Sequence, residues 1–191
     1  MPHILFGLGN PGARYEPTRH NAGWQVLDQL ATESEVVFKR TRLMEALIAD
    51  CRIGDEVVRM VKPVSYMNRV GPVYLRCLDV YDAAPEDALV LVDDFQLDFG
   101  RLRFRARGSA GSHNGLKSIE KILAAQDYPR LKIGIGPAPE GARWADYVLR
   151  GYSVQQKERL PDLLFRGARA VETWVREGIV AASNQFNPPP E

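Results

Sequence analysis

The chain has few cysteines and histidines, and they lie far apart in the sequence. Its 191 residues include two cysteines, Cys51 and Cys77, and three histidines, His3, His20 and His113. No Cys-x-x-Cys pair occurs, and no Cys/His group has the spacing of metal ligands. The sequence therefore predicts two buried free thiols instead of a disulfide framework, and no metal site.

Long apolar runs and targeting patterns are also absent. The N-terminus reads MPHILFGLGNPG, in which no basic segment precedes a long apolar run, so we expect no signal peptide. No stretch approaches the roughly 20 apolar residues that a membrane span needs. These features favour a cytoplasmic protein that does not bind a membrane.

The composition is that of an ordinary globular protein. Hydrophobic residues make up 45% of the chain and charged residues 26%, which leaves enough apolar material for a core. Because about this length is usual for one domain, we expect residues 1–191 to form a single domain. The end of the chain, residues 186–191, is expected to fray.

Apolar segments of strand length alternate with segments of helical periodicity. Strands are expected at residues 3–8, 45–51, 57–61, 88–92, 101–107 and 131–135, and helices at 23–31, 66–81, 116–125 and 163–179. Pro161 is expected in the first turn of the last helix. The pattern predicts an α/β fold, a single three-layer α/β/α domain with a mixed central β-sheet. Ligands of such folds bind at the carboxyl ends of strands.

The charges are distributed unevenly along the chain, although the formal net charge is only +1. Residues 79–98 carry seven acids and no Lys or Arg, whereas residues 100–135 carry eight bases and two acids. On a strand, alternate residues share one face, and the arginines with this spacing are Arg101, Arg103, Arg105 and Arg107. We prefer a patch that contacts phosphates over an exposed edge strand protected by charge.

The first strand is followed by Gly7-Leu8-Gly9-Asn10-Pro11-Gly12, which matches the dinucleotide-binding pattern G-x-G-x-x-G. That pattern should lead directly into a helix, but prolines interrupt this segment and helical periodicity begins only after His20. The preferred interpretation is a turn that presents Asn10 at the carboxyl end of a strand.

His20 lies between a polar loop and the start of a helix, and its ordinary pKa of about 6.5 suits a general base. Asp93 and Asp94 end a buried strand, and neighbouring strand residues point to opposite sides. One of them can therefore face His20 and orient it, but the residues alone also allow two surface acids in a turn. Because no Gly-x-Ser-x-Gly elbow occurs, water is the expected nucleophile.

Two further segments carry polar groups next to helix starts. Asn68, in KPVSYMN, is either a solvated helix residue or a carboxamide directed at a substrate carbonyl. The segment from Gly108 to Gly115 has three glycines in eight residues before a helix. It is either a mobile loop that binds an anion or closes over a site, or a plain connection in which Asn114 caps the helix.

Together these motifs resemble those of bacterial peptidyl-tRNA hydrolases. The family's opening motif is similar to GLGNPGARYEPTRHNAGW, its second to VKPVSYMNRVG and its third to LVDDFQLDFGRLRFRARGSAGSHNGLKSI. Its later segments are similar to YPRLKIGIG, YVLRGY and NQFN, so the resemblance runs from about residue 3 to the end.

The resemblance implies a monomeric single-domain enzyme without a cofactor that hydrolyses the ester between a peptide and the 3′-terminal ribose of tRNA, which recycles tRNA. It implies that His20 activates water with no covalent intermediate and that Asp93 orients His20. It also implies that Asn10, together with Asn68, holds the peptide and the reacting carbonyl. It also assigns substrate binding to Asn68, Asn114, Tyr66, Met67 and Tyr15, and contact with the terminal tRNA phosphate to Arg103, Arg105 and Lys132.

The chain departs from the family pattern at Val70, Gln96, Asp98, Ser112 and Pro137, none of which replaces an expected catalytic group. Two rival functions fit parts of the sequence. A non-enzymatic RNA-binding relative would not need His20 or Asp93, and a small hydrolase acting on peptides or nucleosides would not need the row of arginines.

Overall fold

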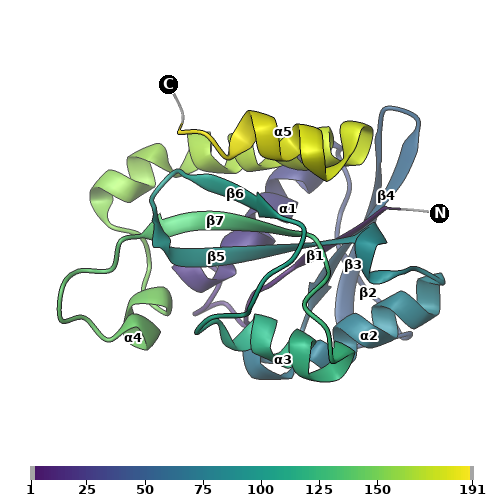
Figure 1. Ribbon diagram of the computed structural model, residues 1–191, viewed down its shortest axis with the longest axis horizontal. Coiled ribbons are helices and arrows are strands. Elements are labelled where there is room, and N and C mark those ends of the chain that lie inside the picture. The colour runs from purple at the N-terminus through teal and green to yellow at the C-terminus, as the bar shows by residue number, and fades with distance from the viewer. Residues whose placement is uncertain (1–2, 190–191) are drawn as a thin grey trace.

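The computed structural model describes residues 3–189, which form one seven-stranded sheet with helices on both faces (Figure 1). The strand order is β2-β3-β4-β1-β5-β7-β6. The strands are β1 (His3–Gly7), β2 (Lys39–Arg40), β3 (Ala46–Ile53), β4 (Glu56–Pro63), β5 (Ala88–Asp98), β6 (Leu102–Arg105) and β7 (Arg130–Gly136). The helices are α1 (Ala22–Glu33), α2 (Val70–Tyr81), α3 (Asn114–Leu123), α4 (Trp144–Val148) and α5 (Val154–Phe186). Three short 3-10 turns are η1 (Arg19–Asn21), η2 (Met67–Arg69) and η3 (Pro85–Asp87).

The centre of the sheet is parallel, which brings the ends of four strands together. β1 pairs in parallel with β4 and β5, and β5 pairs in parallel with β7. The pairs β2–β3, β3–β4 and β6–β7 are antiparallel. The prediction of an α/β fold with a mixed sheet is confirmed. The carboxyl ends of β1, β4, β5 and β7 meet at one edge of the sheet.

Two apolar cores lie on opposite faces of the sheet, because the apolar residues of β1 and β5 alternate between them. Leu5 and Leu91 face the core beneath α1 and α5, whereas Phe6 and Val90 face the core beneath α2 and α3. In Figure 1, α5 covers one side of the sheet, and α2 and α3 cover the other. The predicted three layers are therefore present. Among residues 3–189, every helix is too short or too polar to span a lipid bilayer.

Helix α1 begins unusually close to the strand ends, and a glycine permits this approach. A Cβ atom on Gly23 would lie 2.4 Å from the carbonyl oxygen of Leu91 and 2.9 Å from the backbone nitrogen and oxygen of Leu8. All three atoms belong to the backbone at the centre of the sheet, so they cannot shift without disturbing the strands. Gly23 thus lets α1 hold the preceding turn, which contains His20, against the carboxyl edge of the sheet.

We expect Gly23→Ala to lower the free energy of unfolding by about 1–3 kcal/mol, as overpacking of a tight interior does. Urea unfolding of the two proteins measures this difference. The matched control is Gly151→Ala, since a Cβ there meets only the Pro17 carbonyl oxygen, at 3.6 Å. The control should change stability by less than about 0.5 kcal/mol. Equal losses in the two variants would contradict this description of the α1 contact.

Several boundaries differ from those expected. β5 continues past Val92 to Asp98, and β6 is shorter than residues 101–107, so Arg101 and Arg107 lie outside the strand. The short elements β2 and α4 were not predicted. Helix α5 begins at Val154 because the Ser153 hydroxyl accepts from the Gln156 N–H. The prediction that Pro161 lies in its first turn was wrong, since two helical turns precede that proline.

The prediction that residues 186–191 fray was wrong for Phe186 and Asn187. Phe186 is buried in the core, and the Asn187 side chain pairs with the exposed edge of β6. The Phe104 N–H donates to Asn187 Oδ1 at 2.6 Å, and Asn187 Nδ2 donates to the Phe104 oxygen at 3.3 Å. One carboxamide therefore occupies a donor and an acceptor of the edge strand. Residues 190–191 lie outside the described part.

Candidate active site

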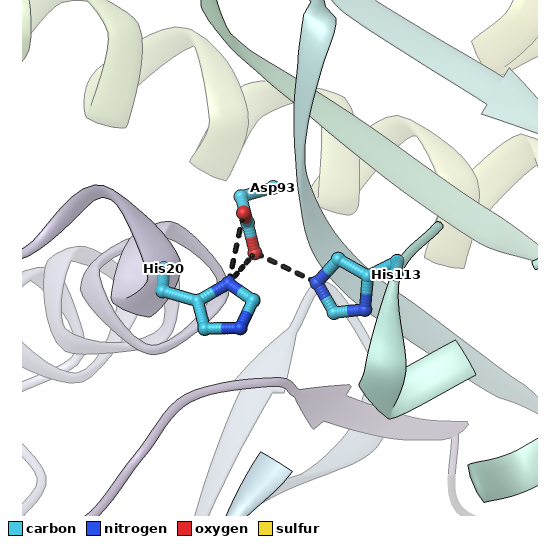
Figure 2. Close-up of side chains that lie close together, drawn as sticks. All are labelled: His20, Asp93 and His113. Carbon is cyan, nitrogen blue, oxygen red and sulfur yellow. Dashed lines mark hydrogen bonds and ion pairs between the residues drawn. The ribbon is translucent and has the colours of Figure 1, made fainter. Parts of the chain in front are cut away.

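His20 and Asp93 meet at the carboxyl edge of the sheet (Figure 2). His20 lies in the η1 turn just before α1, and Asp93 lies in β5. The Nδ1 atom of His20 is 3.0 Å from each carboxylate oxygen of Asp93, and the two residues are only 8% and 4% exposed. Asp94 points elsewhere and pairs with Lys132 Nζ at 3.0 Å. The sequence alone left the choice open, and the structure shows that Asp93 is the acid that contacts His20.

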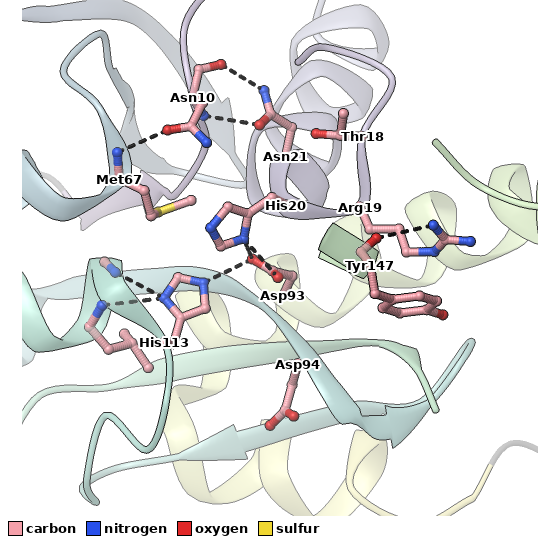
Figure 3. A network of polar contacts seen from close by, with 12 residues as sticks. Asn10, Thr18, Arg19, His20, Asn21, Met67, Asp93, Asp94, His113 and Tyr147 are labelled. Carbon is pink, nitrogen blue, oxygen red and sulfur yellow. Dashed lines mark hydrogen bonds and ion pairs between the residues drawn. The ribbon is translucent and has the colours of Figure 1, made fainter. Parts of the chain in front are cut away.

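A second histidine binds the same carboxylate. His113 Nε2 is 2.9 Å from Asp93 Oδ1, while His113 Nδ1 accepts from the N–H groups of Gly115 and Leu116 at 3.2 and 3.3 Å (Figure 3). Because Nδ1 accepts these hydrogen bonds, the proton of a neutral His113 is on Nε2 and is donated to Asp93. His113 is therefore the cap of α3, and the alternative in which Asn114 caps this helix was wrong.

This arrangement also determines the tautomer of neutral His20. The ionised Asp93 is an acceptor only, so His20 Nδ1 carries the hydrogen that it donates. The other ring nitrogen, Nε2, is then unprotonated and makes no hydrogen bond to any of residues 3–189. A neutral His20 thus offers a lone pair for proton transfer, with its ring orientation held by Asp93.

The pKa values of the pair follow from burial and from their mutual attraction. Burial lowers the pKa of His20, but the charge of Asp93 and its hydrogen bond outweigh this effect, so the pKa is raised above its ordinary 6.5. Burial alone would raise the pKa of Asp93, but the two imidazoles hold it well below its usual range. Asp93 therefore stays ionised throughout the pH range in which His20 titrates.

Asn10 lies beside His20 in a network that fixes the orientation of its amide (Figure 3). The Met67 N–H donates to Asn10 Oδ1 at 2.9 Å, which identifies that atom as the oxygen. The backbone of Asn10 is in turn held by Asn21, which accepts from its N–H at 2.9 Å and donates to its carbonyl at 3.0 Å. Among residues 3–189, the Asn10 Nδ2 group has no acceptor, so it can donate to a bound molecule.

The other residues expected to bind substrate differ in exposure and form few side-chain hydrogen bonds among residues 3–189. Met67 is buried, and Tyr66, Asn68 and Asn114 are exposed, while Tyr15 is half-buried in the loop before η1. Among the described residues, the side chains of Asn68 and Asn114 have no hydrogen-bond partner. Both asparagines are the neighbours of site residues, because Asn68 follows Met67 and Asn114 follows His113.

The basic residues are arranged on β6 and β7. Arg103 lies opposite Lys132 in the antiparallel pair, and Arg105 lies opposite Arg130. Arg130 is fully buried and close to Glu120, at 3.7 Å, so it is not part of a surface patch. Within the described part of the chain, neither Arg103 nor Arg105 forms an ion pair, whereas Lys132 is paired with Asp94. Arg101 donates to the carbonyl of Asn187 at 3.0 Å and so helps to hold the end of α5 against the sheet.

The same centre contains the residues that could hold a metal ion. His20, Asp93 and His113 each offer one donor atom, and these atoms lie within 4.8 Å of one another. Two imidazoles and a carboxylate form a common set of ligands for divalent transition metals. Here the two ring nitrogens already contact the carboxylate, so a bound ion would have to replace both hydrogen bonds. The expectation of no metal site rested on sequence spacing, and this group spans residues 20 to 113.

Three residues of the site were not singled out from the sequence: Arg19, Asn21 and His113. Arg19 is buried, donates to Gln156 Oε1 at 2.7 Å, and stacks over the ring of Tyr147 at 4.1 Å. It ties the η1 turn to α4 and α5 and so helps to place His20. The signal available in the sequence was the run of polar residues Thr18-Arg19-His20-Asn21 directly before an apolar helix.

Replacing His113 with alanine is expected to lower the free energy of unfolding by about 0.5–2 kcal/mol, the usual cost of losing a helix cap. The variant should also lower kcat, but by less than a change of Asp93, because His20 keeps its own hydrogen bond. Urea unfolding and steady-state kinetics measure the two effects. Ser112→Ala is the control, with a change below about 0.5 kcal/mol. A His113 variant as stable as this control would contradict the capping role.

Comparison with known proteins finds similar sequences over nearly the whole chain. A family model described as peptidyl-tRNA hydrolase matches residues 4–191. The chain is 43% identical over 189 residues to a peptidyl-tRNA hydrolase of Symbiobacterium thermophilum, covering 98% of this chain and 100% of that protein. It is 44% identical over 187 residues to one of Leuconostoc mesenteroides, covering 96% and 98%.

The solved structures agree with the sequences. The crystal structure of peptidyl-tRNA hydrolase from Acinetobacter baumannii superposes with a TM-score of 0.90 at 30% identity, covering 97% of this chain and 94% of that one. The match of the family model over nearly the whole chain and the near-complete coverage of these relatives agree. This chain belongs to the peptidyl-tRNA hydrolase family.

Proposed function

We propose that this protein hydrolyses the ester that joins a peptide, or an N-blocked amino acid, to the 3′-terminal ribose of tRNA. The observation that carries the proposal is the His20–Asp93 pair, 3.0 Å apart at the carboxyl edge of the sheet, with His20 Nε2 left without a partner among residues 3–189. The products are a free tRNA and a peptide. Since the substrate arises during translation, we infer that the protein acts in the cytoplasm.

In the proposed mechanism, His20 Nε2 takes a proton from a water molecule as the oxygen attacks the ester carbonyl. The resulting tetrahedral intermediate collapses with the ribose oxygen as the leaving group, which receives the proton from His20. Asp93 stays ionised and stabilises the imidazolium that forms between the two steps. No covalent bond to the protein is made, because water is the nucleophile, and no metal ion is required.

The asparagines supply donors for the reacting carbonyl. Asn10 Nδ2 is free to donate because the Met67 N–H holds its oxygen, and a donor directed at the oxyanion stabilises the intermediate. Asn68 and Asn114 flank the centre from η2 and α3, and we assign them to the peptide and the attacking water. Tyr66, Met67 and Tyr15 form the surrounding wall for the peptide.

We assign the terminal tRNA phosphate to Arg103, Arg105 and Lys132. Removing one cation that contacts a phosphate should reduce the dependence of log binding constant on log salt by about 0.7–0.9. Arg103→Ala is the test, with tRNA binding measured at several salt concentrations. Arg40→Ala, on the exposed strand β2 at the other edge of the sheet, is the matched control. The same salt slope for Arg103→Ala and wild type would remove Arg103 from the site.

The proposed reaction is tested with one tRNA charged in two ways. The protein is incubated with tRNA that carries an N-acetylated amino acid and with the same tRNA that carries the free amino acid, with and without EDTA. We expect cleavage of the acetylated form only, at a rate that EDTA does not change. If the protein binds both and cleaves neither, it is an RNA-binding relative and the hydrolase proposal fails. Loss of activity in EDTA would contradict the metal-free mechanism.

A further inference from the structure

Two stacked aromatic rings, a partly buried Phe95 and an exposed Trp144, lie near the proposed site. Phe95 follows Asp93 by two residues in β5, and Trp144 is the first residue of α4. Their ring planes are within 8° of parallel, with centroids 6.0 Å apart. Trp144 is 41% exposed, whereas Trp24 and Trp174 are 7% and 5% exposed. Trp144 is thus partly exposed to solvent, whereas the other two tryptophans of the chain are buried.

Phe95 lies close to residues of the active site. Phe95 lines a hollow of about 40 Å³ together with Asp93, His113 and Lys132. Its backbone packs closely against β7, since a Cβ on Gly136 would lie 1.9 Å from the Phe95 carbonyl oxygen. Phe95 therefore borders a hollow that it shares with Asp93 and with Lys132, a proposed phosphate contact.

Helix α4 is attached to the turn that carries His20. Arg19 precedes His20, and its guanidinium lies 4.1 Å from the ring centroid of Tyr147 and donates to the Tyr147 carbonyl at 3.2 Å. Figure 3 shows Arg19 and Tyr147 beside the His20–Asp93 pair. Trp144 is one turn away from Tyr147, so it belongs to the same short helix that Arg19 attaches to the His20 turn.

We propose that Phe95 and Trp144 form a stacking platform for an unpaired nucleotide at the 3′ end of the tRNA. This inference rests on the proposed function, in which the ester is at that end. Stacking of a base on an aromatic side chain contributes about 1–3 kcal/mol and accepts every base, because each has a π face. The platform explains how an enzyme for many tRNAs holds the single-stranded end without reading a sequence.

The charges next to the platform suit the same ligand. Arg143 precedes Trp144, and its side chain is 84% exposed with only a distant contact, 3.8 Å, to Asp146. Arg150 is also exposed, just beyond the end of α4. Single-stranded nucleic acid sites combine aromatic rings for the bases with cations for the backbone.

The test compares binding of an uncharged tRNA with an intact 3′ end and of the same tRNA without its last three nucleotides. Trp144→Ala should weaken binding of the intact tRNA by about 5- to 150-fold, the equivalent of one base stack. It should leave binding of the shortened tRNA unchanged. Trp144→Phe should retain most of the affinity, since it keeps an aromatic ring. Leu149→Ala, which removes another exposed apolar side chain at the end of α4, is the matched control and should have no effect.

Fluorescence gives a second readout, because Trp144 is the exposed tryptophan. The intact tRNA should quench the emission of the wild-type protein, and this quenching should be lost in Trp144→Ala. The proposal is overturned if Trp144→Ala binds both tRNAs as well as the wild type does, or loses the same affinity for both. End-dependent binding through Trp144 in a protein that cleaves no acetylated substrate would refute the hydrolase function and leave the platform intact. Cleavage by Trp144→Ala with unchanged tRNA binding would refute the platform alone.

Discussion

His20→Ala should lower kcat for N-acetyl-aminoacyl-tRNA by about 10²- to 10⁴-fold, the usual contribution of a general base. The reason is that His20 Nε2 is the unprotonated nitrogen of the Asp93-bound imidazole, whereas alanine leaves water without a base. Single-turnover cleavage of the acetylated tRNA measures the chemical step directly. The affinity for uncharged tRNA should not change, because no proposed phosphate contact is removed.

The control for this variant is His3→Ala. His3 begins β1 at the opposite end of the strand from Asn10, and its ring packs against Trp174 with centroids 5.3 Å apart. It should retain the wild-type kcat. A His20 variant that keeps more than about a tenth of the wild-type rate would show that another group activates the water, since loss of a general base costs at least about 100-fold.

Asp93→Asn is expected to have a comparable or larger effect, on the order of 10⁴-fold in kcat, as the corresponding change does in a Ser-His-Asp triad. In the wild-type protein, the Asp93 carboxylate accepts hydrogen bonds from both His20 Nδ1 and His113 Nε2. An asparagine places an NH₂ group against one of these N–H donors, so one imidazole must change its tautomer or move. For His20, the wrong tautomer puts the proton on the nitrogen that should accept one.

Asp94→Asn is the matched control for this change, because it alters the neighbouring residue by the same atoms. Asp94 pairs with Lys132 and does not contact either histidine. We expect an unchanged kcat and an altered affinity for tRNA, since Lys132 loses its ion pair. If Asp93→Asn and Asp94→Asn lowered kcat equally, the specific role of Asp93 would be wrong.

The sequence was most informative where one local pattern decides the structure. The apolar runs of β1 and β5 had no competing interpretation, because strands covered on both faces need no polar residues. The strand ends then predicted where Asn10 and Asp93 lie, and the structure places them at the same edge of the sheet. The choice between Asp93 and Asp94 came from the family resemblance, and His20 Nδ1 contacts Asp93.

The features that were missed depend on contacts between distant residues. His113 was one of four polar side chains in a glycine-rich loop, and only the folded chain brings it 2.9 Å from Asp93. Arg130 is one of the eight bases of residues 100–135, yet it is fully buried beside Glu120. Asn187 belongs to a proline-rich end, but the edge of β6 provides partners for its amide. No local pattern encodes these contacts.

The central claim is that neutral His20, held by Asp93, takes the proton from water, and the pH dependence of single-turnover cleavage tests it most directly. The rate should rise with pH and level off once His20 is neutral, with a midpoint above 6.5 because the net effect of its surroundings raises the pKa. In Asp93→Asn the remaining rate should have a lower midpoint, since the charge that raises the pKa is gone and the burial that lowers it remains. The same midpoint in both proteins, or a rate that falls as pH rises through this range, would contradict the claim.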